Sequence, residues 1–338
     1  MRAISRSTLA MLSAWLPATA ASAHVKWFCA FDVAGQPRGL ENVLCPDFEL
    51  LLISAVAALT IGAVIEKTSL EAHILRALDR ATDWPRAYSV RIVAFGCAAF
   101  FVVLWSWGGV LLTPELKTQS PYIPWLQLAI AFGLILRLTS KFAALGIVYL
   151  FLTSVAQYGL FHLMDYPIFV GLAAYLILNS FQVDFFRFRP VDVLRVSVAI
   201  TLMWASIEKW AYPEWTFPLF IIHPGLAMGF DSEFYMRAAG MVEFALAFAL
   251  LLSPLPRRLS ALMLLGMFFA AMPVFGLVDV VGHTPIIVAL IAIIFDNVAY
   301  KTGKSNIVVV PLQFVFSLSV TLFLYYEMHS FIFNTKII

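Results

Sequence analysis

The chain alternates between long apolar runs and short polar segments. About ten of the runs have room for the roughly 15 to 20 apolar residues that cross a bilayer core. They lie near residues 48–66, 91–112, 123–139, 142–161, 166–181, 192–209, 234–253, 259–277, 284–298 and 307–326. The pattern predicts an all-α polytopic membrane protein with about ten transmembrane helices, the shortest of which need neighbouring helices or a locally thinner bilayer.

Composition agrees with a membrane protein and argues against several functions. Of the 338 residues, 62% are hydrophobic and 12% are charged, and the mean hydropathy is +0.90. A soluble domain does not combine so little charge with so many apolar runs. The sequence has no basic tract, no Walker loop, no dinucleotide-binding glycine pattern and no nucleophile elbow, so it gives no sign of nucleic-acid or nucleotide partners or of serine hydrolysis.

Residues 1–23 have the features of a secretory signal peptide. A basic start precedes the mostly apolar residues 9–18, and Ala21-Ser22-Ala23 offers the small residues that signal cleavage requires. Cleavage there would leave His24 at the mature N-terminus, at the head of an exterior segment, 24–47. The alternative is an uncleaved membrane anchor.

Positive charges predict the orientation of the spans. An exterior mature N-terminus places fourteen of the 22 lysines and arginines in inner loops: Lys67, Arg76, Arg80, Arg86, Arg91, Arg137, Lys141, Arg187, Arg189, Arg195, Arg257, Arg258, Lys301 and Lys304. The outer side holds Lys26, Arg38, Lys117, Lys209, Arg237 and Lys336, and the signal peptide holds the other two. This bias follows the positive-inside rule and predicts a bacterial inner-membrane protein with both mature termini in the periplasm.

The first inner loop predicts an amphipathic helix on the inner leaflet. Apolar residues recur there at helical spacing, opposite a charged face. The apolar positions are Leu70, Ile74, Leu78 and Ala81, and the charged ones are Glu71, Arg76, Asp79 and Arg80. We expect this segment to serve as scaffold.

The interior of the chain has the layout of a duplication. Spans two to five (91–190) and six to nine (191–306) each begin after an inner arginine. Each closes on a proline that opens its last span, in Asp165-Tyr166-Pro167-Ile168 and in His283-Thr284-Pro285-Ile286. Two such four-helix units would be parallel repeats. The segments 48–90 and 307–338 add one transmembrane helix at each end.

The second unit resembles the DoxX-like four-helix membrane proteins over about residues 191–300. The motifs concerned are Glu208-Lys209-Trp210, Arg237-Ala238-Ala239-Gly240-Met241-Val242-Glu243, Pro256-Arg257-Arg258-Leu259 and Gly282-His283-Thr284-Pro285. The first unit, about 91–181, has no counterpart of Lys209 or Glu243. The resemblance implies membrane-bound redox work, as in a subunit of thiosulfate:quinone oxidoreductase and in oxidative-stress complexes, with quinone as the expected cofactor.

Glu243 is a candidate functional residue because it lies about 14 Å into its span, at 1.5 Å per residue. A carboxylate at that depth is costly unless it is paired or protonated. We expect Arg237, Lys209 and Glu208 to surround it, and Gly240 to allow close approach of another helix. The group would form a proton or quinone-headgroup site. The alternative is an ion-pair network that fixes helix register.

The histidines suggest a second site. Only His73 lies inside in this layout, and the other five of the six lie outside: His24, His162, His223, His283 and His329. Helical spacing would let Asp165 orient His162, and Asp279 orient His283. Two or three of these imidazoles would bind copper, zinc or iron, and an amino-terminal His24 suits copper. No local metal-binding pattern is present, so the alternative is interfacial packing.

Two further features bear on the exterior face. Pro273 and Gly276 predict a kink in the span 259–277, which would widen a cavity near the exterior histidines. Cys29 and Cys45 flank a polar exterior segment and predict one disulfide bridge, because disulfides persist outside the cytoplasm. Copper ligation and thiol chemistry are the alternatives for these two cysteines, whereas Cys97, inside a span, is expected to be a packing residue.

Three functions remain open from the sequence. The first is a redox-linked, quinone-associated membrane component with a periplasmic redox partner. The second is a transporter or channel for a metal ion or small solute, which repeats and intramembrane charges favour. The third is a non-catalytic assembly subunit that holds a partner through the exterior segments 24–47 and 211–233.

Overall fold

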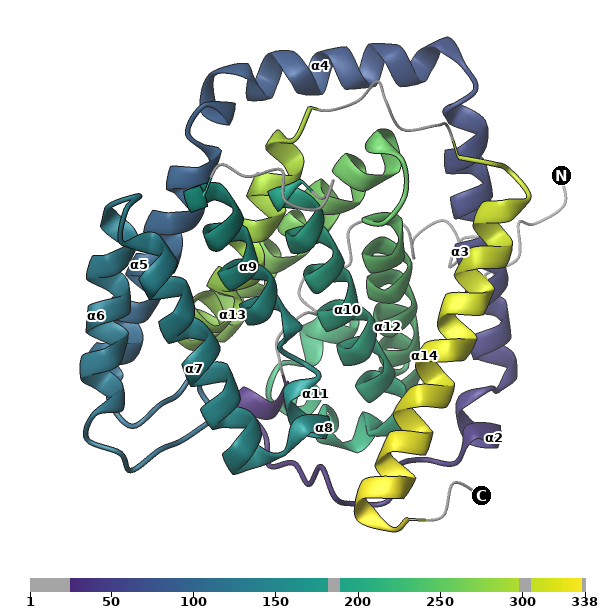
Figure 1. Cartoon of the computed structure of the whole chain (residues 1–338). Helices are drawn as coiled ribbons and strands as arrows, with labels where there is room; N and C mark the ends of the chain where they lie inside the picture. The colour runs from purple at the N-terminus through teal and green to yellow at the C-terminus, as the bar shows by residue number, and fades with distance from the viewer. Residues whose placement is uncertain (1–24, 182–188, 298–304, 336–338) are drawn as a thin grey trace, which may run out of the picture.

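Apolar helices packed side by side make up the protein (Figure 1). The computed structural model describes residues 25–181, 189–297 and 305–335, and these contain helices and one isolated bridge but no strand. The predicted signal peptide and His24 lie outside the described residues.

Nine longer helices run between the two ends of the molecule. They are α3 (Pro46–Ile65), α5 (Ser89–Trp107), α6 (Ile123–Ile135), α7 (Ser140–Tyr158), α9 (Pro167–Phe181), α10 (Pro190–Ala211), α12 (Ser232–Ala249), α13 (Pro254–Phe295) and α14 (Val309–Phe333) among the described residues. The short elements are η1 (Val25–Trp27), α2 (Leu40–Val43), α8 (Leu160–Leu163), η2 (Pro213–Trp215), α11 (Phe217–Ile222) and η3 (Pro224–Ala227).

Six helices of the described chain are long and apolar enough to cross a membrane, namely α3, α5, α7, α10, α13 and α14. The helices α6 and α9 are apolar but have 13 and 15 residues, which gives lengths of only about 20 Å. Helix α12 carries Glu233, Arg237 and Glu243. The chain is thus an all-α multi-pass membrane protein, whereas the predicted count of ten spans is not confirmed.

The kink predicted near Pro273 and Gly276 is present in α13. Gly276 has φ 70° and ψ −155°, a conformation outside the helical region that only glycine adopts readily. The two predicted spans 259–277 and 284–298 are therefore two helices joined at Gly276. Arg258, near the start of the first, donates to Ile294 O, near the end of the second, at 2.9 Å, so the chain doubles back at Gly276. Asp279 and His283 lie in the second helix.

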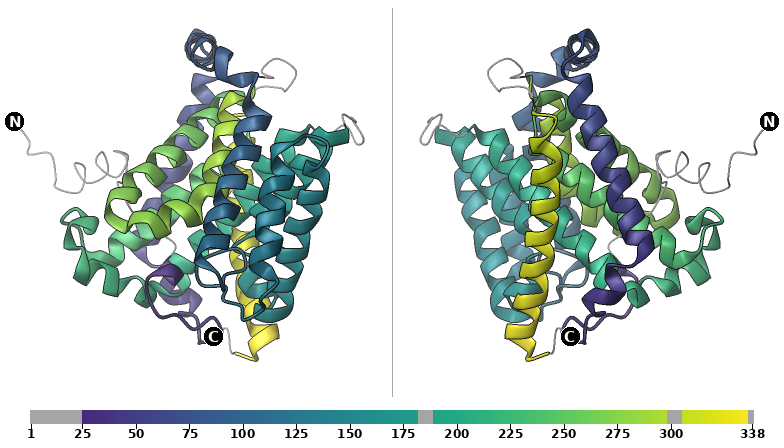
Figure 2. Two further views of the ribbon diagram at one scale, coloured as in Figure 1. Left: turned by 90° about the vertical axis from the view of Figure 1, so that its left-hand side faces the viewer. Right: turned by 90° about the vertical axis from the view of Figure 1, so that its right-hand side faces the viewer.

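The predicted amphipathic segment is helix α4 (Ser69–Arg86), which lies across one end of the other helices (Figures 1 and 2). The Thr68 hydroxyl caps it by accepting from Leu70 N. Its buried Leu75 packs with Leu255 of α13, and Asp79 pairs with Arg258 at 2.6 Å. We call this end of the molecule the α4 end.

The opposite end is crossed by residues 25–45, which we call the strap (Figure 1). Its backbone is tied to helices far away in sequence. Arg38 N donates to Ala211 O at 2.8 Å, and the Tyr326 hydroxyl donates to Arg38 O at 2.7 Å. We call this end the strap end.

Two groups of helices meet along α9 and α10, which pack against each other, as do α5 and α13. In Figure 2 the teal helices of residues 123–181 lie on one side and the green helices of residues 232–295 on the other. The predicted four-helix units, 91–190 and 191–306, and their common origin stay predictions.

The predicted orientation can be tested by cysteine labelling from one side of the membrane. In a background without Cys29, Cys45 and Cys97, we expect an impermeant maleimide to label Gln119→Cys, at the strap end, in intact spheroplasts. We expect His73→Cys, on α4, to be labelled only after permeabilisation, because positive charges favour the inner side. Both positions are exposed in the structure. The reverse pattern would show that the strap faces the cytoplasm.

Candidate functional site

A lysine of the strap is buried at the strap end. Lys26, in η1, has a side-chain exposure of 0%, and its Nζ lies 2.5 Å from Asp165 Oδ2 and 2.6 Å from Glu208 Oε1. Asp165 precedes α9, and Glu208 lies in the last turn of α10. One ammonium group thus joins three segments that are far apart in the sequence. Lys26 is 139 residues from Asp165 and 182 residues from Glu208.

Electrostatics keep Lys26 charged. Burial by itself lowers the pKa of a lysine, but here Asp165 and Glu208 outweigh it and hold the pKa of Lys26 above its usual range. The ammonium therefore stays protonated at all physiological pH values. Each carboxylate in turn depends on this cation, because a buried charge without a partner is strongly destabilising.

Aromatic rings enclose the same ammonium group. Lys26 Nζ lies 5.7 Å from the ring centroid of Phe31 and 5.5 Å from that of Trp215. Rings at this distance attract a cation through their negative faces. Two carboxylates and two aromatic faces therefore make this a binding site for an ammonium group, which Lys26 occupies.

A second acid lies beside the first. Glu115, in the loop between α5 and α6, accepts through Oε1 from the Thr113 hydroxyl at 2.9 Å and from the Tyr166 hydroxyl. His162 Nε2 is 3.7 Å from the same oxygen. Burial and Glu115 both raise the pKa of Tyr166, so this hydroxyl keeps its proton and acts as a donor. The loop is held by Gln127, whose amide donates to the carbonyls of residues 110 and 111.

A third acid follows the kink of α13. His283 Nδ1 lies 3.1 Å from both the backbone oxygen and Oδ1 of Asp279, and the ring of Trp27 stacks on His283 at 4.7 Å. A side chain on Gly282 would meet that ring, since an added Cβ would lie 2.1 Å from it. Glycine at 282 thus allows the strap to dock.

A small cavity of about 10 Å³ lies under Trp27. That is about the volume needed for one water molecule. Asp165, Tyr166 and Ile168 line it from one side, and His283 and Pro285 from the other. The two proline motifs predicted to be equivalent in a duplicated chain therefore face one another here. We call the surrounding group the Lys26 site, made up of Lys26, Glu115, His162, Asp165, Glu208, Asp279 and His283.

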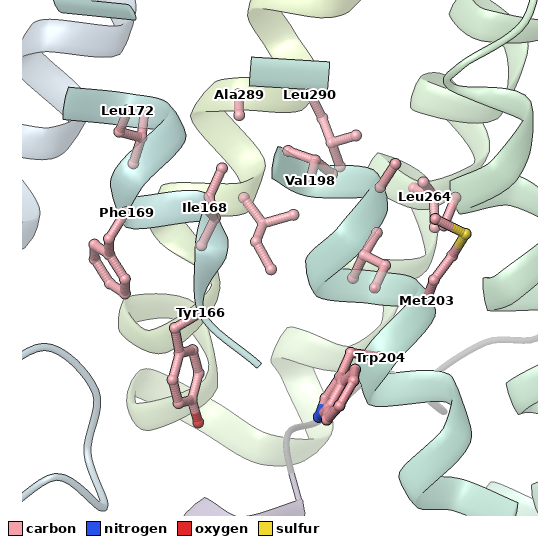
Figure 3. Close-up of a cluster of buried hydrophobic side chains, with 14 of the residues drawn as sticks. Tyr166, Ile168, Phe169, Leu172, Val198, Met203, Trp204, Leu264, Ala289 and Leu290 are labelled. Atoms are coloured by element: carbon pink, nitrogen blue, oxygen red, sulfur yellow. The ribbon is translucent and has the colours of Figure 1, made fainter. Parts of the chain in front are cut away.

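Apolar packing closes the Lys26 site on the side of the α4 end. Figure 3 shows buried side chains of α9, α10 and α13, with Tyr166 and Trp204 at one edge of the cluster. Phe169 and Leu172 follow Tyr166 along α9, and Val198 precedes Glu208 along α10, so these residues lie toward the α4 end. The described structure is therefore closed on both sides of the site.

The acid partners of the histidines agree only in part with the prediction. His283 lies beside Asp279, as expected. His162 lies beside Glu115 instead of Asp165, because Asp165 is taken by Lys26. His329 Nε2 lies 2.8 Å from the Tyr212 hydroxyl and 2.9 Å from Val33 O.

The strap contacts three of the predicted histidines. Phe31 packs on His162 at 5.6 Å, Trp27 packs on His283, and Val33 bonds to His329. Within the described residues, no three His, Cys, Asp or Glu side chains are gathered as a metal ion requires. His223 packs on Phe275 at 5.9 Å. Copper, zinc or iron binding by these histidines stays a prediction.

The predicted disulfide bridge between Cys29 and Cys45 is absent, and both residues are free thiols. They pack in different places: Cys29 lies against the cluster around Leu219 and Phe220, whereas Cys45, at the start of α3, lies against the main core. The disulfide was predicted from the positions of the two cysteines at the ends of one polar segment. That pattern does not reveal that the strap holds them against different clusters. Burial raises the pKa of the Cys29 thiol.

The group predicted around Glu243 divides into separate pairs. Lys209 Nζ is 3.1 Å from Glu243 Oε1, as expected, whereas Glu208 pairs with Lys26. Arg237 instead pairs with Glu233 and Asp47. Gly240 allows the close approach that was predicted, because Trp210 packs on it and donates to the backbone oxygen of residue 237. The catalytic roles proposed for these residues stay predictions.

Comparison with known proteins gave no match: no family model, no curated protein and no solved structure is similar to the chain. Fold and site together define a multi-pass α-helical membrane protein with a buried ionisable site at one end. The DoxX-like resemblance of residues 191–300 remains a hypothesis.

Replacing Lys26 should destabilise the protein more than replacing any exposed lysine. In Lys26→Met, Asp165 and Glu208 are left buried without their cation, and we expect a loss of about 3–5 kcal/mol of unfolding free energy. Lys117→Met is the matched control, because Lys117 is exposed at the same end. Melting temperatures in detergent measure both variants. Equal losses would mean that the buried ion pairs contribute nothing specific.

Proposed function

We propose that the protein transports protons across the bilayer through the Lys26 site. One observation carries the proposal: the site holds four buried carboxylates, Glu115, Asp165, Glu208 and Asp279, and a single buried ammonium group. Fixed cations do not balance these acids. Protons or a bound cation must do so, because uncompensated buried carboxylates are costly.

Unpartnered oxygens show where a proton would be held. Asp165 Oδ1, Glu115 Oε2 and Asp279 Oδ2 have no hydrogen-bond partner among the described residues, and Asp279 Oδ1 lies 3.1 Å from His283 Nδ1. Asp165 also lines the small cavity. His162 and His283 lie next to these acids, and imidazole is the side chain that exchanges protons near neutral pH. Acid, imidazole and room for one water are the components of a proton relay.

The position of the site also supports transport. It lies where α9 of the first predicted unit meets α10 and α13 of the second. Many transporters place substrate sites between repeats and build them from broken helices. In α13 the backbone leaves the helical conformation at Gly276, three residues before Asp279.

Transport requires a second conformation, since the apolar core and the strap close the site on both sides. We infer that bending at Gly276 and release of the strap open it alternately. In this proposal Lys26 is a tethered cation that fills the site when no other cation is bound. The strap end faces the periplasm of a bacterial inner membrane, as the positive charges predict.

The redox-linked function is a second candidate because Lys209 and Glu243, both part of the DoxX-like motif, form a buried pair. In this reading the pair would bind the charge of a quinone headgroup. Glu243→Gln should then abolish quinone-linked activity.

The assembly-subunit function has no observation that favours it over these two.

Proton flux into vesicles tests the proposal. Purified protein is reconstituted with a pH-sensitive dye inside, and a potassium gradient with valinomycin makes the interior negative. We expect wild-type vesicles to acidify faster than empty ones. Glu115→Gln should slow the flux about tenfold or more, because it removes a proton-binding group at a cost of at least about 1.4 kcal/mol in the barrier.

Glu214→Gln is the control for that flux. Glu214 is an exposed carboxylate at the strap end that takes no part in the Lys26 site. Its replacement should leave the flux unchanged. Wild-type vesicles that acidify no faster than empty ones would refute proton transport, and a Glu115→Gln flux equal to that of wild type would place the pathway elsewhere.

A further inference from the structure

A larger cavity, of about 530 Å³, lies at the α4 end, away from the Lys26 site. It is bounded by the start of α5, the turn between α6 and α7, and the end of α9. Its volume falls within the range of ligand-binding pockets, roughly 300–1,000 Å³. Its lining is polar on one side and apolar on the other, and it takes no part in the proposed function.

Two arginines leave the cavity strongly positive. Arg91 makes no hydrogen bond or ion pair with any residue that the structure describes. Arg137 donates to the backbone oxygen of Asn179 at 3.0 Å and pairs with no described carboxylate. No acidic side chain is among the described residues that line the cavity. Among the residues that the structure describes, nothing neutralises the two guanidinium charges, which we take to be available to an anion.

Helix ends add to this positive character. Helices α5 and α7 both begin at the cavity, at Ser89 and Ser140, and neither has a side-chain cap on its first N–H groups. Uncapped N–H groups at helix N-termini attract anions. The Ser140 and Ser180 hydroxyls also line the cavity, but they donate to Arg137 O and Leu176 O. A phosphate group matches this set, since guanidinium binds its oxygens in a bidentate manner.

The other wall of the cavity is apolar and continues onto the outer surface of the helices. Phe95, Leu134 and Leu176 line the wall. Phe95 and Leu136 are 53% and 62% exposed at its mouth. In a membrane protein such side chains face lipid tails. A ligand that fits both walls has an anionic head and long apolar chains.

We propose that this cavity binds the headgroup of an anionic diacyl phospholipid from the leaflet at the α4 end. Arg91 and Arg137 hold the phosphate, and the acyl chains follow the surface beside Phe95. Basic pockets between transmembrane helices on the inner side are suited to such headgroups. The site is independent of the proposed transport function.

Native mass spectrometry of the detergent-purified full chain tests this proposal. The protein is titrated with phosphatidylglycerol and with phosphatidylcholine of identical acyl chains. We expect phosphatidylglycerol to bind at least about tenfold more tightly, and Arg91→Gln to remove about that factor, because charge-assisted hydrogen bonds are stronger than neutral ones. Arg91 is exposed and makes no hydrogen bond or ion pair with a described residue, so its replacement should not disturb folding.

Arg76→Gln, an exposed arginine of α4 outside the cavity, is the control and should bind phosphatidylglycerol as wild type does. Equal binding of the two lipids would show annular contact only and overturn the proposal. An equal loss of phosphatidylglycerol affinity in Arg91→Gln and Arg76→Gln would also overturn it. Inorganic phosphate that displaces phosphatidylglycerol at equal concentration would assign the cavity to a free anion instead.

Discussion

The burial of one ammonium group between two carboxylates is the constraint on which the strap end depends. Lys26 reaches Asp165 and Glu208 with no exposure to solvent. Removing Lys26 leaves both carboxylates buried and uncompensated, which is far more costly than losing a surface ion pair. The positions of the strap, of the turn before α9 and of the end of α10 are therefore coupled.

This coupling extends to the histidines. The strap packs Phe31 on His162 and Trp27 on His283, and its backbone bonds to His329. If Lys26 leaves its site, these contacts cannot stay as they are, because they belong to the same short segment. Opening of the Lys26 site and rearrangement of the imidazoles are thus one event. An acid site closed by its own cation responds to anything that competes with that cation.

Local features of the fold could be predicted from the sequence. Hydrophobic periodicity located the helices and α4, Gly276 located the kink, and helical spacing brought His283 to Asp279. The pairing of Lys209 with Glu243 was also predicted correctly. Each of these depends on neighbours along the chain or on one helix packing against the next.

The centre of the site could not be predicted in the same way. Lys26 was predicted to lie on the outer side with the other exterior charges, and it was not among the candidate site residues. Its partner Asp165 is 139 residues away, and Glu115 lies in a loop that only tertiary contacts bury. The burial of a loop residue depends on tertiary contacts, so it cannot be read from the residues next to it in the sequence. The aromatic residues Trp27 and Phe31 beside Lys26 are the one local signal of a buried cation, because aromatic rings attract an ammonium group.

Chemical rescue of Lys26→Ala tests most directly whether an ammonium group at this position holds the strap end together. This variant removes three methylenes and the ammonium group, which n-propylammonium replaces. The account predicts that n-propylammonium raises the melting temperature of Lys26→Ala, that n-propanol does not, and that wild type responds to neither. Equal effects of the amine and the alcohol, or no rescue by the amine, would contradict it.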